Sequence, residues 1–160
     1  MYEPSIVKWI NKMFNYSFSK EWYETYWAFD LHGTVIKPNY KQGILALELY
    51  DYAKESLQIL TKRHDIILFT YTSSYPEELK FYLDELKKVD IHFNYVNENP
   101  EISDSTGAFG YYKFKPYFNV MFEDKAGFFP ETDWEPVYKC LLEWDKKQPP
   151  IKWKENFNKK

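Results

Sequence analysis

Cysteine is almost absent from this chain, and long apolar runs and basic character are missing as well. Cys140 is the single cysteine, which excludes an internal disulfide bond and a thiolate metal cluster. The apolar runs, such as IILF at 66–69, are far shorter than a membrane span. The amino terminus, MYEPSIVKWINK, lacks the basic-then-apolar order of a secretory signal. We therefore expect a soluble protein of a reducing, cytoplasmic compartment, or of the host cytoplasm if the chain is viral.

The chain also lacks a large excess of charge of either sign. The 21 Lys and Arg residues and 24 Asp and Glu residues give a net charge of -3, so the whole chain has no attraction to nucleic acid or acidic membranes. The sequence shows neither an internal repeat nor a low-complexity segment. Its 160 residues, 44% apolar and 28% charged, are typical of one globular domain.

Helical and β-prone apolar patterns alternate along the chain. We expect helices at 5–14, at 44–63, from Pro76 onward and from near Trp134, strands at 22–29, 66–70, 91–96 and 118–124, and a long loop at 97–114. This alternation predicts an α/β fold, a Rossmann-like three-layer α/β/α sandwich with a mostly parallel sheet. Residues 22–147 would form the main domain. Residues 1–21 would form an amphipathic helix packed on the core or on a partner, and 148–160 an irregular tail.

Polar residues stand at the ends of three of these strands: Asp30, Thr70, and Glu123 with Asp124. The carboxyl ends of parallel strands meet at one edge of a sheet, so these side chains should converge. Adjacent carboxylates repel each other unless a cation lies between them, and Mg²⁺ prefers carboxylate and phosphate oxygens. The sequence therefore predicts a Mg²⁺ site formed by Asp30, Glu123 and Asp124. Cys140, in contrast, falls in a helical apolar pattern and is expected in the core, while His64 and His92 are expected at the surface.

A phosphate bound beside that metal needs hydrogen-bond donors and a positive charge. Thr70 offers a hydroxyl, the backbone amides that follow Asp30 can point inward, and Lys115 offers a charge, with Lys113 as its alternative. Gly33 would let the main chain bend close to the ligand. With the phosphate charge neutralised, the Asp30 carboxylate can act as a nucleophile and form an acyl phosphate that water hydrolyses.

The order of these residues resembles the haloacid dehalogenase-like (HAD-like) superfamily over residues 26–128. The matching features are DLHGT after an apolar strand, a strand that ends in Thr, and a Lys before a strand that ends in an acid. VNENP at 96–100 and FFPETDW at 128–134 also resemble segments of small HAD-like proteins of phages and bacteria. The resemblance implies that Asp30 is the nucleophile and a metal ligand. It implies that the His32 backbone carbonyl and Asp124 are further metal ligands, with Glu123 beside them. It also implies that Thr70 and Lys115 are catalytic residues that bind the phosphate, which would be surrounded by Leu31, Gly33, Thr34 and Tyr71.

One position departs from the family pattern. HAD-like phosphatases usually carry a second Asp two residues after the nucleophile as general acid and base, and here that residue is His32. Imidazole titrates near neutrality and could protonate a leaving oxygen. Equally, loss of a positioned acid can cost roughly 10²- to 10⁴-fold in rate, which would leave a phosphate binder or a slow enzyme. Both interpretations stay open.

Neither the 35–69 segment nor the 71–114 segment leaves room for a cap domain. Capless family members act on exposed phosphates, or borrow a lid from a partner subunit, so a homo-oligomer is an open expectation. The expected function is a Mg²⁺-dependent phosphomonoesterase that acts on a phosphorylated small molecule or an exposed phosphate of a macromolecule. The alternatives are a HAD-like fold without catalysis, used for phosphate binding or assembly, and a nucleotide or nucleic-acid end phosphatase. Nucleic acid is the less favoured partner, and the aromatic loop around Phe109, Tyr111 and Tyr112 favours loop packing over base stacking.

Overall fold

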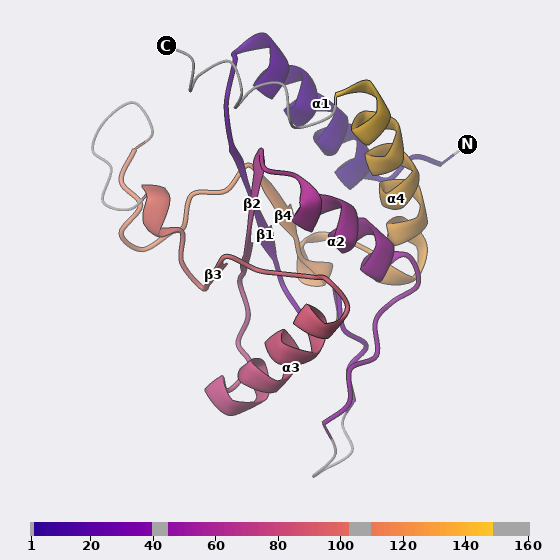
Figure 1. Ribbon diagram of the computed structural model, residues 1–160, viewed down its shortest axis with the longest axis vertical. Helices are drawn as coiled ribbons and strands as arrows, with labels where there is room; N and C mark the ends of the chain where they lie inside the picture. The colour runs from indigo at the N-terminus through magenta and orange to yellow at the C-terminus, as the bar shows by residue number, and fades with distance from the viewer. Residues whose placement is uncertain (1, 40–44, 103–109, 149–160) are drawn as a thin grey trace.

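A parallel sheet forms the centre of the molecule. The computed structural model describes residues 2–39, 45–102 and 110–148. Within them, β1 (Thr25–Phe29), β2 (Ile66–Thr70), β3 (Tyr95–Val96) and β4 (Val120–Phe122) form an all-parallel sheet of order β3-β2-β1-β4. The helices are α1 (Ser5–Ser19), α2 (Ala53–Lys62), α3 (Pro76–Lys88) and α4 (Pro130–Lys147), as Figure 1 shows. The predicted Rossmann-like α/β fold with a parallel sheet is confirmed.

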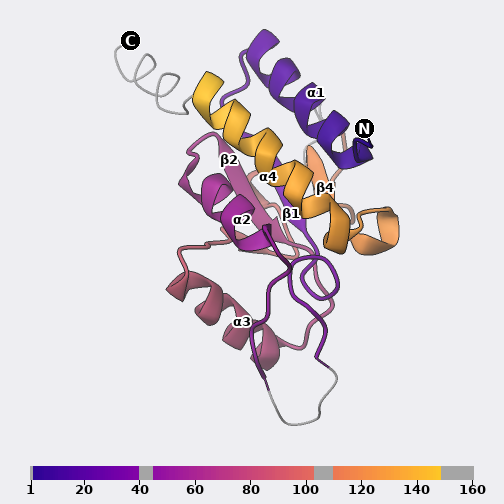
Figure 2. The same cartoon turned by 90° about the vertical axis from the view of Figure 1, so that its right-hand side faces the viewer.

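The two faces of the sheet are covered differently. Trp27 and Phe29 of β1 point into the main core, to which all four helices contribute buried residues. Helices α1, α4 and α2 lie side by side over this face (Figure 2). Tyr26 and Ala28 point to the other face, where Tyr117 and Phe118 of the β3–β4 connection cover them. The direction of the connections explains this division. The chain runs from β1 to β2 to β3 in one direction across the sheet and then returns in the other direction to β4. Because connections between parallel strands are right-handed, connections that run in opposite directions lie on opposite faces of the sheet.

The amino-terminal helix packs on the core. Val7, Ile10, Met13 and Phe14 of α1 are buried at helical spacing, and the Phe14 ring stacks on Trp144 of α4 at 4.9 Å between centroids. The helix continues to Ser19, five residues beyond the expected end, because no Gly or Pro interrupts it. In the described part of the chain, no helix combines the length and apolarity that crossing a membrane requires.

The helix expected at 44–63 is wrong in its first part, because α2 begins only at Ala53. Residues 48–50 instead pair with the segment after β1: Leu49 forms an antiparallel bridge with Ile36, and the Lys37 amide donates to the Glu48 carbonyl at 2.7 Å. Tyr52, with φ +66°, then turns the chain into the helix. Leu49, which falls at helical spacing before Ala53, is therefore explained by its pairing with a neighbouring segment and not by a helix.

Other boundaries differ by smaller amounts. β3 is reduced to Tyr95–Val96, since Ile91 and Phe93 are buried without ladder pairing. α4 begins at Pro130, earlier than Trp134, because Pro is well suited to the first turn of a helix. The long loop contains a 3₁₀ turn, η1 (Pro100–Ile102). Phe109 and residues 149–160 of the expected tail lie outside the described residues.

Candidate metal and phosphate site

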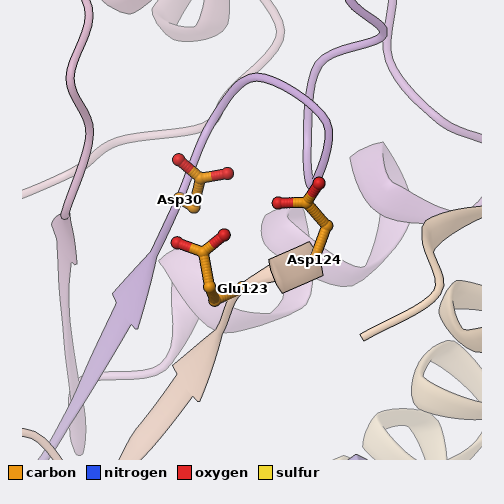
Figure 3. Close-up of side chains that lie close together, drawn as sticks. All are labelled: Asp30, Glu123 and Asp124. Carbon is orange, nitrogen blue, oxygen red and sulfur yellow. The ribbon is translucent and has the colours of Figure 1, made fainter. Parts of the chain in front are cut away.

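Three carboxylates converge at the carboxyl ends of the two central strands. Asp30 follows β1 directly, and Glu123 and Asp124 follow β4. Because Phe29 is in register with Phe122, the residues after both strands reach the same edge. One oxygen from each carboxylate lies within 4.8 Å of the others, and Figure 3 shows the three groups facing a common space. The sequence prediction that these acids meet agrees with this geometry.

The Thr34 hydroxyl joins two of the acids. It donates to Asp30 Oδ2 at 3.0 Å and accepts a hydrogen bond from the Asp124 amide, also at 3.0 Å. Thr34 is completely buried, so no water competes for these bonds. The hydroxyl therefore fixes the orientation of the Asp30 carboxylate relative to the start of η2 (Asp124–Ala126).

A tight turn places Thr34 beneath the acids. The Leu31 carbonyl accepts hydrogen bonds from the amides of Thr34, Val35 and Ile36, and the Gly33 amide donates to the Ile36 carbonyl at 2.8 Å. Gly33 has φ +83°, and a Cβ at this position would lie 3.0 Å from Asp124 Oδ2. Glycine is therefore required here both by the backbone conformation and by the closeness of the carboxylate. The amides of Gly33 and Thr34, which were expected at the phosphate, are paired within this turn.

The electrostatics of the cluster oppose full ionisation. Burial raises the pKa of Asp30, and the negative charge of Asp124 raises it further, while hydrogen bonds from the Thr34 hydroxyl and the Leu31 amide act in the opposite direction. Burial and contact with the Asp124 carboxyl likewise raise the pKa of Glu123. A cation between these oxygens would remove both penalties. The donor set is all oxygen, which suits Mg²⁺ or Ca²⁺ and not a soft metal.

A cleft of about 1230 Å³ opens over the acids. Of the other residues expected at the site, His32, Gly33 and Tyr71 line it, whereas Leu31 and Thr34 are buried beneath the surface. Thr70 is also completely buried, and its Oγ1 has no hydrogen-bond partner among the described residues. It precedes Tyr71, which lines the cleft.

The two lysines expected at the phosphate lie elsewhere. Lys115 and Lys113 are exposed, with Nζ over the rings of Phe118 and Phe114 at 5.9 and 5.6 Å, and neither lines the cleft. The lysine that lines the cleft, among the described residues, is Lys125. Lys125 directly follows Asp124, but the family order places the phosphate-binding lysine before the strand, so the sequence pointed to Lys115 instead.

His32 has a partner that the sequence did not indicate. Its Nδ1 lies 3.1 Å from Ser74 Oγ, and its ring meets Tyr82 of α3 edge-on at 4.9 Å. Ser74 lies in the loop between β2 and α3, 42 residues further along the chain. Only the folded sheet, which brings the ends of β1 and β2 together, reveals this contact.

Comparison with known proteins supports the fold. A solved structure of a conserved protein from Bacteroides thetaiotaomicron is similar to this chain with a TM-score of 0.56. The match has 20% sequence identity and covers 75% of this chain and 91% of that chain. No family model matches the sequence, and no curated protein matches it. The similarity to known proteins therefore extends to the arrangement of strands and helices.

Proposed function

We propose that this chain is a Mg²⁺-dependent phosphomonoesterase of the HAD-like type with Asp30 as its nucleophile. The observation that carries the proposal is the convergence of Asp30, Glu123 and Asp124, with oxygens within 4.8 Å of one another, at the carboxyl ends of parallel strands. Open α/β sheets bind ligands at this edge. A bound Mg²⁺ would neutralise the acids and the phosphate, so that one anion can approach another.

The chain's own residues account for the remaining chemistry. Thr34 holds Asp30 Oδ2 at 3.0 Å, which leaves Oδ1 to attack phosphorus. As the bond from phosphorus to the ester oxygen breaks, His32 gives a proton to that oxygen and an acyl phosphate remains on Asp30. Water then attacks phosphorus while His32 accepts its proton. The bond to Asp30 breaks, and inorganic phosphate and free carboxylate result.

Two further groups suit a phosphate ligand. The buried Thr70 hydroxyl lacks a partner among the described residues, and an orphaned buried hydroxyl costs free energy until a group such as a phosphate oxygen accepts its proton. Lys125 lines the cleft itself, whereas Thr70 lies beneath it next to Tyr71, and Lys125 supplies a positive charge. Lys125 replaces Lys115 as our candidate for the phosphate-neutralising lysine.

The charge of the cleft bears on the substrate. Its described lining contains four acids, Asp30, Glu78, Glu123 and Asp124, against Lys125 as the lysine. Such a surface repels a chain of phosphates but can accept one phosphate once a cation is bound. We therefore favour a monoester with a single phosphate over a nucleic-acid end.

The direct test is phosphate release from generic monoesters with Mg²⁺ and after chelation. Asp30→Asn should abolish release because the amide cannot act as a nucleophile, while Glu55→Gln, an exposed change on α2 outside the cleft, serves as the matched control. Release unchanged in Asp30→Asn would reject this mechanism.

A second candidate function is phosphate binding without turnover, which the His32 replacement favours. His32→Asp restores the family pattern and discriminates between the two. A large gain in turnover would indicate a decayed site, and a loss would indicate chemistry by the imidazole.

A further inference from the structure

The imidazole of His32 is held on two sides. Ser74 Oγ lies 3.1 Å from Nδ1, and the Tyr82 ring meets the imidazole at 80° and 4.9 Å between centroids. All three residues line the cleft. The contact with Ser74 engages Nδ1, so Nε2 is the ring nitrogen left for a ligand.

Ser74 is itself anchored. Its amide donates to Thr72 Oγ1 at 3.3 Å, and the two hydroxyl oxygens lie 3.0 Å apart. The Thr72 amide in turn donates to Asn97 Oδ1 at 2.7 Å, which ties this loop to the chain just beyond β3. The hydroxyl beside His32 therefore belongs to a network fixed at the same sheet edge as the acids.

We propose that Ser74 is a positioning residue that holds His32 in the tautomer with the proton on Nδ1. This inference rests on the proposed function. Thr72 Oγ1 has two lone pairs, so it can accept both the amide and the hydroxyl of Ser74. The Ser74 oxygen then accepts the Nδ1 proton of His32. Which imidazole nitrogen carries the proton is set by the hydrogen bond of the other nitrogen.

The tautomer matters for the reaction. A histidine that gives a proton to the leaving oxygen and then takes one from water needs a ring nitrogen that no other contact engages, and Ser74 engages Nδ1, so this role falls to Nε2. With Nδ1–H donated to Ser74, Nε2 carries a lone pair when the ring is neutral and accepts a proton directly. If Nδ1 were the acceptor instead, Nε2 would already carry its proton and could not act as the base.

The test reads the tautomer without using activity. In metal-free protein labelled with ¹⁵N histidine, at a pH where the nitrogen shifts show the ring to be neutral, two-bond nitrogen–hydrogen correlations assign the protonated nitrogen. The chain has 3 histidines, and the exposed His64 and His92 serve as internal references. We expect Nδ1–H at His32 in the wild type and a shift toward Nε2–H, the form that solvent favours, in Ser74→Ala.

Two further variants test whether the Ser74 hydroxyl sets the tautomer of His32. Ser74→Thr keeps the hydroxyl and should restore the wild-type tautomer, whereas Ser73→Ala removes the neighbouring serine hydroxyl and should not change it. Nε2–H at His32 in the wild type, or an unchanged tautomer in Ser74→Ala, would overturn the proposal.

Kinetics then separate the inference from the proposed function. If phosphate is released, Ser74→Ala should lower kcat by roughly 10- to 100-fold, as loss of an orienting partner does, with KM little changed. If the wild type releases no phosphate from any ester, the proposed function fails and the tautomer measurement alone decides the role of Ser74. Release with an unaltered tautomer in Ser74→Ala would reject the positioning role and leave the phosphatase intact.

Discussion

The indole nitrogen of Trp134 donates a 2.8 Å hydrogen bond to the backbone carbonyl of Thr34, 100 residues earlier in the chain. Both residues are completely buried. The Trp134 ring also stacks on Phe122 of β4 at 5.2 Å. Through these two contacts, α4 holds the turn after β1 and the end of β4 in one arrangement, and these are the segments that carry the three acids.

Trp134→Phe should therefore destabilise the fold. The change leaves the Thr34 carbonyl buried without its donor, which costs about 1–3 kcal/mol of unfolding free energy. Trp9→Phe is the matched control, because Trp9 also donates to a carbonyl, that of Asn119, but is 41% exposed, so that water can replace the donor. Urea denaturation should show a clearly larger loss for Trp134→Phe, and equal losses would contradict the role of the buried bond.

Thr34→Val should weaken metal binding. Valine matches threonine in shape but lacks the hydroxyl that joins Asp30 Oδ2 to the Asp124 amide. We expect Mg²⁺ affinity to fall by roughly 10- to 100-fold, the usual effect of losing a group that orients a metal ligand. Thr34→Ser keeps the hydroxyl and should bind Mg²⁺ nearly as the wild type does. Titration calorimetry measures both, and similar affinities for Val and Ser would show that the hydroxyl does not matter.

Exchange of single lysines should distinguish the two candidates for phosphate binding. Lys125 lines the cleft, whereas Lys115 places its Nζ over the Phe118 ring. Lys125→Met should raise KM for a generic monoester by about tenfold, equivalent to about 1.4 kcal/mol of binding energy. Lys115→Met should leave KM unchanged. A larger effect at Lys115 would restore the assignment made from the sequence.

Stability and metal binding should depend on pH together. In the folded protein, the pKa of Asp30 is raised above 3.8 and that of Glu123 above 4.5. For an acid with a raised folded pKa, the stabilisation is complete below the unfolded pKa and is lost as pH rises through the folded pKa. The metal-free protein is thus weakened as these acids ionise, and a cation reverses this loss.

Mg²⁺ should consequently raise Tm more at about pH 7.5 than at about pH 4.5, where protons already relieve the repulsion. Thermal unfolding with and without the cation measures the difference. Glu123→Gln removes one ionisable group and should reduce the pH dependence of the metal-free protein. An equal rise in Tm at both pH values would contradict binding by these carboxylates.

Cys140 should react slowly with thiol reagents in the native protein. Burial raises the pKa of the Cys140 thiol from 9.0 to about 11, with Glu143 and Glu3 contributing. At neutral pH this gives about 100-fold less thiolate, the reactive form, and Cys140 as a residue is only 8% exposed. Alkylation by iodoacetamide should be much faster in denaturant. Equal native and denatured rates would show that the helix α4 opens readily around this residue.

Much of the framework could be predicted from the sequence. Asp30 and the Glu123–Asp124 pair each follow an apolar, β-prone run, and alternating helices imply that such runs lie parallel, so their ends meet. The positions of these acids along the chain are local properties. The helix expected at 44–63 shows the limit of prediction from spacing, because Leu49 pairs with Ile36 and is not part of a helix. An apolar residue at helical spacing does not reveal which surface buries it.

The sequence alone determined the acids at the strand ends, the parallel arrangement of the strands and the single buried thiol, since these follow from residue type and from spacing along the chain. The tertiary structure decided which polar side chains share the cleft with the acids: Ser74 at His32, and Lys125 in place of Lys115. The reason is that a side chain's direction depends on the turn that carries it and on packing against distant segments. Neither is encoded in the residues beside it.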